Sequence, residues 1–550
     1  MSDSHVSDDA RAAVRAYHQQ SKHSFERYAP GPASLDWDAQ PDPFRHFAGC
    51  GRIELPLSAD RIDLPFSALN DPGAIPGQSL GSDSIGRLLE LSLAVSAWKS
   101  LGAARWAVRC NPSSGNLHPV EAYLVLPESE LGSAGLYHYE AKEHLLEQRC
   151  AFDEDLAGRL SALLPPGCLL VGLSLVPWRE AWKYGVRAWR YCQLDLGHAI
   201  GALGYAAACN GWQMRSLADW SLGEIGRLLG LDRSDDFEPD EPEYPAGLLM
   251  LGPEPAKLRP QGSLLDALTA QHWHGKANRL DPRHLYRWDA VDEMARLIKP
   301  PAGSSGPAAE NLSALQPAPG EPPAAEVIRR RRSARAFDPR LGIDSGMFYR
   351  LLDGCRPRPG TPPWDKNQGR SPLHLLLFVH RVEGLAPGLY LLGADRHAAE
   401  ALCAIMRPEF TWERPPGCPG DLPSHHLISA NARTVAMQLG CHQQICAQSA
   451  FALAMLGEFD TALNESEGGY DMLLREAGRI GQALYLNAEA EGIGSSGIGC
   501  FFDDPIHEMF GLQDQRLQTL YMFTVGPAME ERGLIDLPAY PRQRQGMPRT

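Results

Sequence analysis

Several features that mark other protein classes are missing from this chain of 550 residues. No apolar run reaches the roughly 20 residues that a membrane helix needs, and residues 168–176 are among the longest. The twelve cysteines include no Cys-x-x-Cys pair, which fits reduced structural thiols in a chain of this length. The formal charge is −15, so nucleic acid and anionic membranes are poor partners for the chain as a whole.

Processing and metal signals are missing as well. The first nine residues are polar and acidic, so we expect no signal peptide there. No P-loop, Ser-His-Asp arrangement or recognised metal-ligand spacing occurs, and no metal site is expected. A composition of 44% hydrophobic and 22% charged residues is typical of a soluble globular protein. We therefore expect a cytoplasmic protein.

The two halves of the sequence share segments in the same order. Three pairs match: Gly135-Leu136-Tyr137 with Gly388-Leu389-Tyr390, residues 195–212 with 476–493, and residues 248–253 with 521–527. Their offsets agree within loop variation, which predicts a tandem duplication of a domain-sized unit. The predicted organisation is an N-terminal arm (1–65), a first domain (66–299), a Pro-rich linker (300–323) and a second domain (324–550).

Apolar periodicity predicts mixed helices and strands without β-α-β alternation, and so an α+β fold. The expected helices are residues 85–98, 188–208, 324–331, 344–353, 434–456 and 470–490, and the expected strands are residues 120–126, 169–176, 373–379 and 521–525. The helix 188–208 carries Gly197, Gly201 and Gly204. Each glycine costs about 1 kcal/mol of helix stability, which implies close backbone approach to a neighbour.

Two motifs, one in each half, have chemistry suited to an anionic or planar ligand. The first half holds the turn Pro112-Ser113-Ser114-Gly115-Asn116, whose hydroxyls, amide and backbone can bond the edge of a flavin or nicotinamide ring. The second half holds Arg331, Arg332, Ser333 and Arg335, which suit a terminal phosphate because arginine binds phosphate in bidentate geometry. The alternatives are an ordinary turn that enters a strand and a solvated basic patch after a linker.

Two further segments complete the candidate set. Residues 492–497 read G-I-G-S-S-G, but the motif follows a helix, so backbone amides presented to a planar ring are favoured over a dinucleotide fold. The alternative is a glycine stop after the helix. Lys183 and Tyr184 lie between a strand and the glycine-bearing helix and could act as base and acid, although a surface helix turn would look the same.

These residues resemble the nitroreductase superfamily of FMN enzymes and, within it, the SagB-type dehydrogenase branch. The matching elements are R-R-S-x-R-x-F at 331–337, P-S-S-G-N with Pro119 and Glu121, and the stretch from Lys183 and Tyr184 through Asp195, Gly197 and His198. The resemblance implies two nitroreductase-like domains, each a central, mostly antiparallel sheet wrapped by helices. It also implies that the two domains pair as an intramolecular pseudo-dimer.

In that family FMN lies at the dimer interface, so the resemblance implies one composite site. Cofactor contacts are expected from Arg331, Arg332, Ser333, Arg335, Glu491, Gly492, Ile493 and Gly494 of the second half and from Pro112, Ser113, Ser114 and Asn116 of the first half. The reciprocal position lacks these motifs, since residues 364–368 read W-D-K-N-Q, residues 76–79 read P-G-Q-S and Asn210 replaces the glutamate.

The implied activity is hydride transfer through flavin N5, with Lys183 and Tyr184 as catalytic residues in dehydrogenation of an azoline-like ring in a peptide or small molecule. Two alternatives stay open: an NAD(P)H-dependent nitro or quinone reductase, and a non-catalytic flavin-binding scaffold. The expected partners are a small-molecule or peptide substrate, with NAD(P)H as an optional electron donor. A further homodimer of whole chains is left open.

Overall fold

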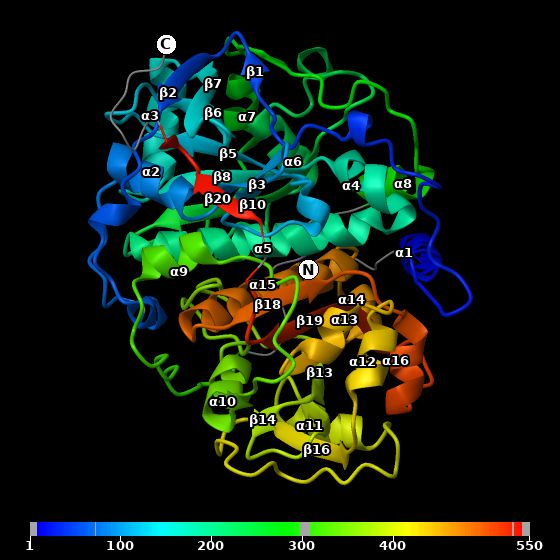
Figure 1. Ribbon diagram of the computed structural model, residues 1–550. Coiled ribbons are helices and arrows are strands. Elements are labelled where there is room, and N and C mark those ends of the chain that lie inside the picture. Colours follow the sequence, from blue (N-terminus) through cyan, green and yellow to red (C-terminus); the bar gives the residue numbers. More distant parts are fainter. Residues whose placement is uncertain (1–7, 72, 298–308, 531–532, 542–550) are drawn as a thin grey trace.

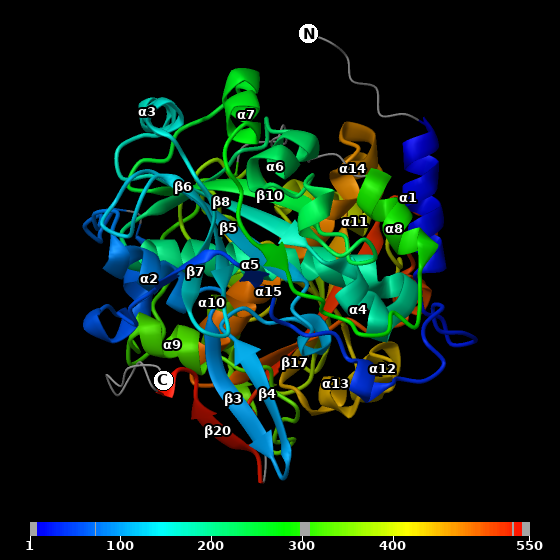
Figure 2. The ribbon, with the colours of Figure 1, turned by 90° about the horizontal axis from the view of Figure 1, so that it is seen from above.

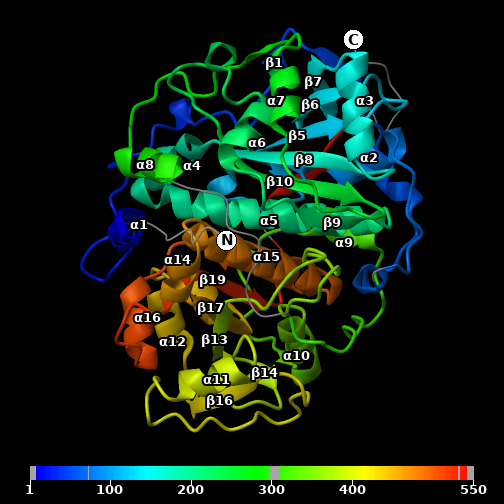
Figure 3. The ribbon, with the colours of Figure 1, turned by 180° about the vertical axis from the view of Figure 1, so that it is seen from behind.

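The computed structural model describes residues 8–71, 73–297, 309–530 and 533–541. Two antiparallel sheets lie on opposite sides of a pair of long helices, α5 (Ala188–Cys209) and α15 (Gly469–Ala490) (Figures 1 and 3). Each sheet is covered by helices on its outer face. In the part of the chain that is described, no helix is both long and apolar enough to cross a membrane.

The first sheet has the strand order β2-β7-β6-β5-β8-β10-β9, and neighbouring strands run antiparallel. Its strands are β2 (Gly51–Glu54), β5 (Val120–Leu126), β6 (Gly135–Glu140), β7 (Leu145–Ala151), β8 (Leu169–Leu175), β9 (Gln213–Ser216) and β10 (Tyr244–Gly252). The surrounding helices are α2 (Ser82–Glu90), α3 (Glu154–Leu163), α4 (Pro177–Tyr184), α6 (Leu222–Leu229), α7 (Gly262–Thr269) and α8 (Asp289–Leu297).

The second sheet has the order β16-β15-β13-β17-β19-β18, again antiparallel, and repeats the order of the first sheet without its β2 edge. Its strands are β13 (Leu373–Val379), β15 (Gly388–Leu392), β16 (Ser424–Ser429), β17 (Phe451–Gly457), β18 (Gly494–Ile498) and β19 (Gln518–Gly526). The helices of this half are α9 (Ala324–Arg330), α10 (Ser345–Asp353), α11 (Arg396–Cys403), α12 (Arg433–Leu439), α13 (Gln444–Gln448), α14 (Phe459–Glu465) and α16 (Asp503–Phe510). This arrangement confirms the predicted α+β fold with two similar domains.

Both chain ends cross to the opposite domain. Near the C-terminus, β20 (Ile535–Pro538) pairs with β3 (Val95–Leu101), which also pairs with β4 (Ala104–Arg109), so a strand of the second half closes a sheet of the first (Figures 1 and 2). At the other end, α1 (Asp8–Gln20) packs on the second half. There His18 bonds the Tyr470 hydroxyl at 3.1 Å, and Arg15 pairs with Asp460 at 2.7 Å.

The described part of the linker, residues 309–323, has no helix and lies along the second domain. Glu310 pairs with Arg356 at 2.9 Å, and Arg358 donates to the Ser313 carbonyl at 3.0 Å. Residues 300–308 of the predicted linker lie outside the described residues.

Two predicted helices are wrong. Residues 85–98 contain most of α2 and then the start of β3, because pairing with the next strand, β4, and with the distant β20 makes Val95 onward a strand. Residues 434–456 contain α12, α13 and then β17, a strand between β13 and β19 that is buried on both faces. A continuous apolar run of that kind cannot be told from a buried helix by periodicity alone.

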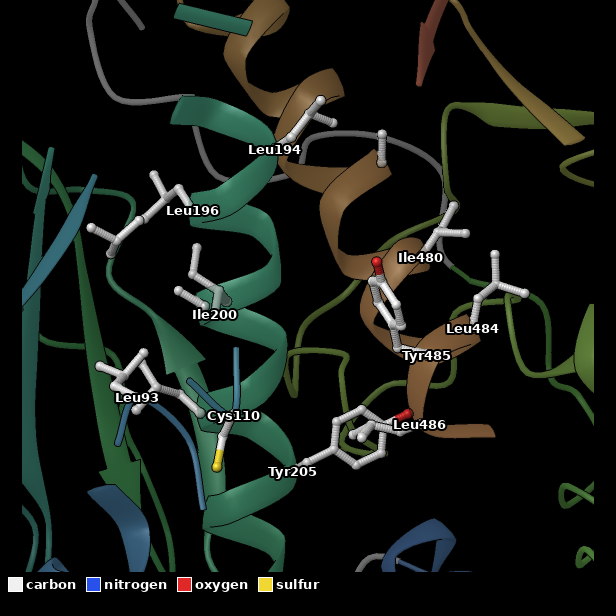
Figure 4. Packing of buried hydrophobic residues seen from close by; sticks show 14 of the residues in the cluster. Leu93, Cys110, Leu194, Leu196, Ile200, Tyr205, Ile480, Leu484, Tyr485 and Leu486 are labelled. Carbon is white, nitrogen blue, oxygen red and sulfur yellow. The ribbon is translucent and has the colours of Figure 1, made fainter. Parts of the chain in front are cut away.

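Of the glycines predicted to permit close approach, Gly197 lies where the α5 backbone meets α15, Gly201 faces the Gln482 side chain of α15, and Gly204 faces Met214 and Pro363 instead. A Cβ on Gly197 would be 2.1 Å from the Arg475 carbonyl oxygen, and one on Gly478 would be 2.2 Å from the Leu194 carbonyl oxygen. The two backbones therefore touch, and residues such as Ile200 and Leu484 on either side join one hydrophobic cluster (Figure 4).

We predict that Gly478→Ala lowers the free energy of unfolding by about 1–3 kcal/mol, because the added methyl group forces the two helices apart. Alanine alone favours a helix by about 1 kcal/mol over glycine, so the sign of the effect separates crowding from propensity. Gly158→Ala is the matched control, since Gly158 lies in α3 with open space around a Cβ. Thermal denaturation measures both variants, and equal or higher stability of Gly478→Ala would contradict the packing.

Candidate functional site

The P-S-S-G-N turn of the first half lies between β4 and β5 and is held by Asp195 of α5. Ser113 Oγ donates to Asp195 Oδ2 at 2.7 Å, and Ser114 Oγ donates to Asp195 Oδ1 at 2.9 Å. The backbone N–H of Ser114 also donates to the carboxylate, at 2.9 Å. Asn116 Nδ2 donates to the Ala107 carbonyl at 2.8 Å, and Pro112 precedes the turn. Both hydroxyls thus donate to α5; Ser113 Oγ also accepts the His118 N–H at 2.8 Å, so each hydroxyl keeps some acceptor capacity for a ligand.

The arginine segment of the second half meets the first half just ahead of that turn. Arg331 is buried and donates from Nε to the Cys110 carbonyl at 3.1 Å, and its guanidinium lies 4.9 Å from the centre of the Tyr485 ring. Arg332 is partly exposed and donates to Ser96 Oγ at 3.1 Å, while Arg335 is exposed. Arg331 therefore links the two domains, Arg332 also pairs with Asp536 at 3.4 Å, and Arg335 lies at the surface.

The third predicted element begins at the end of α15. The Glu491 carboxylate forms two hydrogen bonds with Arg350, at 2.6 and 2.9 Å, so it is engaged within its own domain. Gly492 has φ +75°, and no atom lies within 4 Å of a Cβ placed on it. Ile493 packs against the core, and Gly494 begins β18. The exposed part of this element is the backbone at Gly492, whose N–H donates to the Glu489 carbonyl at 3.0 Å, and not the glutamate side chain.

Two tyrosines of the second half connect these elements. The Tyr485 hydroxyl contacts Ser333 Oγ at 2.8 Å and accepts from the Gly497 N–H at 2.9 Å. The Tyr521 hydroxyl bonds His198 Nε2 at 3.2 Å, and His198 lies one helical turn after Asp195 on α5. A continuous series of contacts thus joins the arginine segment to the P-S-S-G-N turn. Neither tyrosine was singled out from the sequence, where a tyrosine in an apolar stretch looks like core.

Lys183 and Tyr184, at the end of α4, lie against the same turn. A Cβ on Gly115 would be 2.7 Å from the Tyr184 hydroxyl and 3.2 Å from Lys183 Cδ, and Gly115 has φ +59°. Glycine is therefore required there for both space and backbone conformation. Lys183 Nζ is 5.3 Å from the centre of the Tyr184 ring. The structure brings the predicted acid–base pair and the predicted ring-edge turn together.

Burial sets the protonation states around this turn. It lowers the pKa of Lys183 against the opposing effect of Glu180, and it raises the pKa of Tyr184 well above its usual value. A lysine with a lowered pKa is a better base at neutral pH, and a tyrosine with a raised pKa keeps its proton.

Glu180, one turn ahead of Tyr184 on α4, was missed by sequence reasoning. It is fully buried, and neither carboxyl oxygen has a hydrogen-bond partner in the described structure. Burial, and then the nearby Asp195, raises the pKa of Glu180 well above its usual range. The spacing of Glu180 and Lys183 on one helix is the only signal in the sequence, and it is common on helix surfaces.

The pseudo-symmetric position across the domain interface is an open cavity of about 580 Å³. Its lining includes Arg215 and Ser216 of β9, Asp365, Asn367 and Gln368 ahead of β13, and Glu476 and Arg479 of α15. These segments correspond in position to β18, to the P-S-S-G-N turn and to Asp195 and His198. Neither residues 76–79 nor Asn210 and Gly211 line the cavity. The lining of this cavity therefore differs in residue type from the P-S-S-G-N turn and the arginine segment, and whether the cavity binds a ligand stays a prediction.

The composite site has polar atoms to offer a bound FMN. Buried atoms there without a hydrogen-bond partner in the described structure are Arg331 Nη1, Arg332 Nε, Asn111 Oδ1, His118 Nδ1 and Ser495 Oγ. Buried polar groups in proteins are normally satisfied, so such a cluster around one site fits a missing polar ligand. The residues present, a positively charged segment and an exposed glycine backbone, suit a phosphate and a polar ring edge.

Comparisons with known proteins agree with this fold. The model of the nitroreductase family matches residues 420–527. A solved structure assigned as a nitroreductase from Anabaena variabilis is 21% identical, with a TM-score of 0.67, and covers 94% of this chain and 99% of its own. No curated protein matches the chain by sequence. The chain therefore has the nitroreductase fold, in two domains, and the later part of its second domain matches the family's sequence model.

Two further structures resemble parts of the chain. An Exiguobacterium sibiricum protein, assigned as a nitroreductase and solved with FMN, is 16% identical and covers 40% of this chain and 91% of its own, with a TM-score of 0.23. The Escherichia coli microcin synthetase McbBCD, solved with truncated pro-MccB17, contains a chain that is 17% identical and covers 45% of this chain and 94% of its own, with a TM-score of 0.26.

We predict a pH dependence from Asp195. Burial raises its pKa to about 7 from an ordinary 3.8, against the hydrogen bonds from Ser113 and Ser114. Because the folded pKa lies above the unfolded one, the unfolded chain loses this proton first as the pH rises. The contribution of Asp195 to the free energy of unfolding is therefore fully present below the unfolded pKa and declines, by up to roughly 4 kcal/mol, as the pH rises to about 7.

Asp195→Asn replaces this titratable carboxyl group with an amide. The stability difference between the native protein and Asp195→Asn, from denaturant titrations at about pH 4 and about pH 7, should shift in favour of the variant at the higher pH. A difference that does not change with pH would show that Asp195 has an ordinary pKa.

Proposed function

We propose that the protein is an FMN-dependent oxidoreductase with one composite site per chain, built at the interface of two domains that arose by tandem duplication. The observation that carries the proposal is the contact between Arg331 of the second half and the carbonyls of Arg109 and Cys110, directly ahead of the P-S-S-G-N turn. The nitroreductase fold and the family match over residues 420–527 support it.

In this proposal the chain holds the two ends of FMN with different domains. Arg332, Ser333 and Arg335 bind the phosphate, and Arg331 holds the arginine segment against the first domain. Ser113, Ser114 and Asn116 face the ring edge, fixed by Asp195, and the backbone from Gly492 to Gly494 lies against the ring, with the Gly492 N–H already bonded to the Glu489 carbonyl. FMN, when bound, supplies hydride transfer at flavin N5.

The proposed reaction is dehydrogenation of an azoline-like ring in a peptide or small molecule, as in the SagB-type branch. Lys183, whose pKa burial lowers, accepts a proton from the substrate. Tyr184, whose pKa burial raises, keeps its phenolic proton and donates a hydrogen bond. Burial raises the pKa of Glu180 beneath them, which favours its neutral form beside Asp195.

For cofactor binding, we predict that Arg332→Ala combined with Arg335→Ala weakens FMN binding at least tenfold, since one charge-assisted hydrogen bond contributes about 1.5–3 kcal/mol. The matched control is Arg215→Ala combined with Arg479→Ala, which removes two arginines from the pseudo-symmetric cavity and should leave FMN binding unchanged. Fluorescence titration with FMN measures both affinity and stoichiometry, and we expect one FMN per chain. Two FMN per chain, or equal loss in both double variants, would show that the composite site is not the binding site.

For catalysis, we predict that Lys183→Ala and Tyr184→Phe keep FMN and lower turnover by about 10²–10⁴-fold. Stopped-flow reduction of the bound flavin by azoline-containing peptides measures the step that needs the base. Bleaching by NADPH is the internal control, because hydride donation from a nicotinamide requires no substrate deprotonation. Fast bleaching by NADPH with no azoline oxidation in the native protein would favour a nitro or quinone reductase, and unchanged turnover in both variants would remove their catalytic role.

A further inference from the structure

Cys441 and Cys500 come from separate segments of the second half and meet near the surface. Cys441 lies between α12 and α13, and Cys500 lies between β18 and α16. Both residues are half-buried, and their thiols are in hydrogen-bonding contact. All twelve cysteines are free thiols in this structure, so the pair is present in its reduced form.

Backbone and amide contacts lock the two segments together. The Phe502 N–H donates to the Leu439 carbonyl at 2.8 Å. Gln443 Nε2 donates to the Cys500 carbonyl at 3.1 Å and to the Gly440 carbonyl at 2.9 Å. The meeting of the two thiols is therefore built into the fold on both sides.

The backbone at Cys441 is strained. Cys441 has φ +51° and the next residue, His442, has φ +62°. Two consecutive non-glycine residues in the left-handed region are uncommon, and each such conformation costs of order 1 kcal/mol or more. Strain of this kind persists where the surrounding structure enforces it, and here it accompanies the approach of Cys441 to Cys500.

His23 of the N-terminal arm faces Cys500 with a defined tautomer. Its Nδ1 accepts the Ala29 N–H at 2.8 Å, so in the neutral ring Nε2 carries the proton and donates to the Cys500 sulfur. Arg187 of the first half donates twice to the Gly499 carbonyl, at 3.0 and 3.2 Å, which places its positive charge beside Cys500. Donors and positive charge around a sulfur stabilise its thiolate.

These contacts make the two thiols unequal. The hydrogen bond from Cys441, followed by that from His23, lowers the pKa of Cys500 to about 5, although burial opposes this. The same hydrogen bond, followed by burial, raises the pKa of Cys441. A sulfur that has donors and positive charge around it, beside a second thiol, is the arrangement of an attacking and a resolving cysteine.

Other uses of the cluster fit less well. Among the described residues, no group of three or more His, Cys, Asp or Glu side chains could hold a metal ion. The pair is reachable, since Cys441 and Cys500 are each partly exposed.

We propose that Cys441 and Cys500 are a redox-active dithiol that forms an intramolecular disulfide by exchange with low-molecular-weight disulfides. The Cys500 thiolate attacks one sulfur of the external disulfide, forms a mixed disulfide and releases one thiolate. Cys441 then loses its proton and attacks Cys500 Sγ, which forms the internal disulfide and releases the second thiolate. The protein loses two electrons and the Cys441 proton, and the external disulfide becomes one thiol and one thiolate.

The test uses the full-length protein, reduced and then equilibrated with mixtures of reduced and oxidised glutathione. Peptide mass spectrometry after alkylation should show a Cys441–Cys500 cross-link that increases with the oxidised fraction. Cys441→Ser should instead accumulate a glutathione mixed disulfide on Cys500, because the resolving thiol is absent. Cys403→Ser, which removes the exposed cysteine of α11, is the matched control and should form the cross-link as the native protein does.

A second measurement does not depend on any variant that removes a cysteine. Iodoacetamide should alkylate Cys500 about tenfold faster than Cys403 at about pH 6, since its larger thiolate fraction outweighs its lower intrinsic nucleophilicity. His23→Asn keeps an acceptor for the Ala29 N–H but removes the donor to Cys500, so this advantage should shrink. Glutathione on Cys403 without any Cys441–Cys500 cross-link, or alkylation of Cys500 no faster than Cys403, would overturn the proposal.

Discussion

The crossing of α5 and α15 at Gly197 and Gly478 is the contact on which the arrangement of the two domains depends. Helices usually pack 8–10 Å apart because side chains separate them, whereas here a helix backbone touches a helix backbone. Asp195 and His198 flank Gly197 on α5, so the crossing also places the residues that hold the P-S-S-G-N turn and bond Tyr521. A shift of one helix along the other would separate the candidate site into its two halves.

The exchange of chain ends strengthens this interface through a buried charge. Asp503 of the second half accepts from Arg187 at 3.1 Å and from Arg190 at 2.8 Å, both of the first half, and from the His23 N–H of the arm at 3.1 Å. The two guanidiniums hold the pKa of Asp503 below its usual range despite its burial. Removal of one partner from such a group leaves an uncompensated buried charge, which is far more costly than a lost surface ion pair. Three separate segments are therefore tied to one carboxylate.

The sequence alone predicted the elements whose pattern is local. The helix over 188–208 and the strands at 120–126 and 373–379 have strong patterns of their own, and the structure contains all three as α5, β5 and β13. The strand β17 depends on partners far away in the sequence, and the strand at Val95 pairs with its neighbour β4 and with the distant β20; both were predicted as helix. The exchange of β20 could not be foreseen, because nothing in its own residues distinguishes an edge strand of one domain from that of the other.

The candidate site follows the same division. The motifs at 112–116, 331–335 and 491–494 were located from residue types, and the first two meet across the domain interface as expected. The direction of each side chain could not be predicted from the sequence. Arg331 donates to the Cys110 carbonyl, and Glu491 is bonded by Arg350. Tyr485 and Glu180 were missed, since their importance comes from what surrounds them after folding. Burial and pairing are properties of the tertiary structure, and they cannot be predicted from the type of a single residue.

The presence of both halves in one polypeptide has a consequence for the concentration dependence of the site. A site shared by two separate subunits disappears on dilution, because the dimer dissociates by mass action. Here the linker and the exchanged ends make pairing of the halves intramolecular, with an effective local concentration that dilution leaves unchanged. The paired arrangement of the two halves therefore needs only to be more stable than the same chain with its halves apart. The two halves are also free to diverge, because a substitution in one interfacial position is not copied to the other, as it would be in a homodimer.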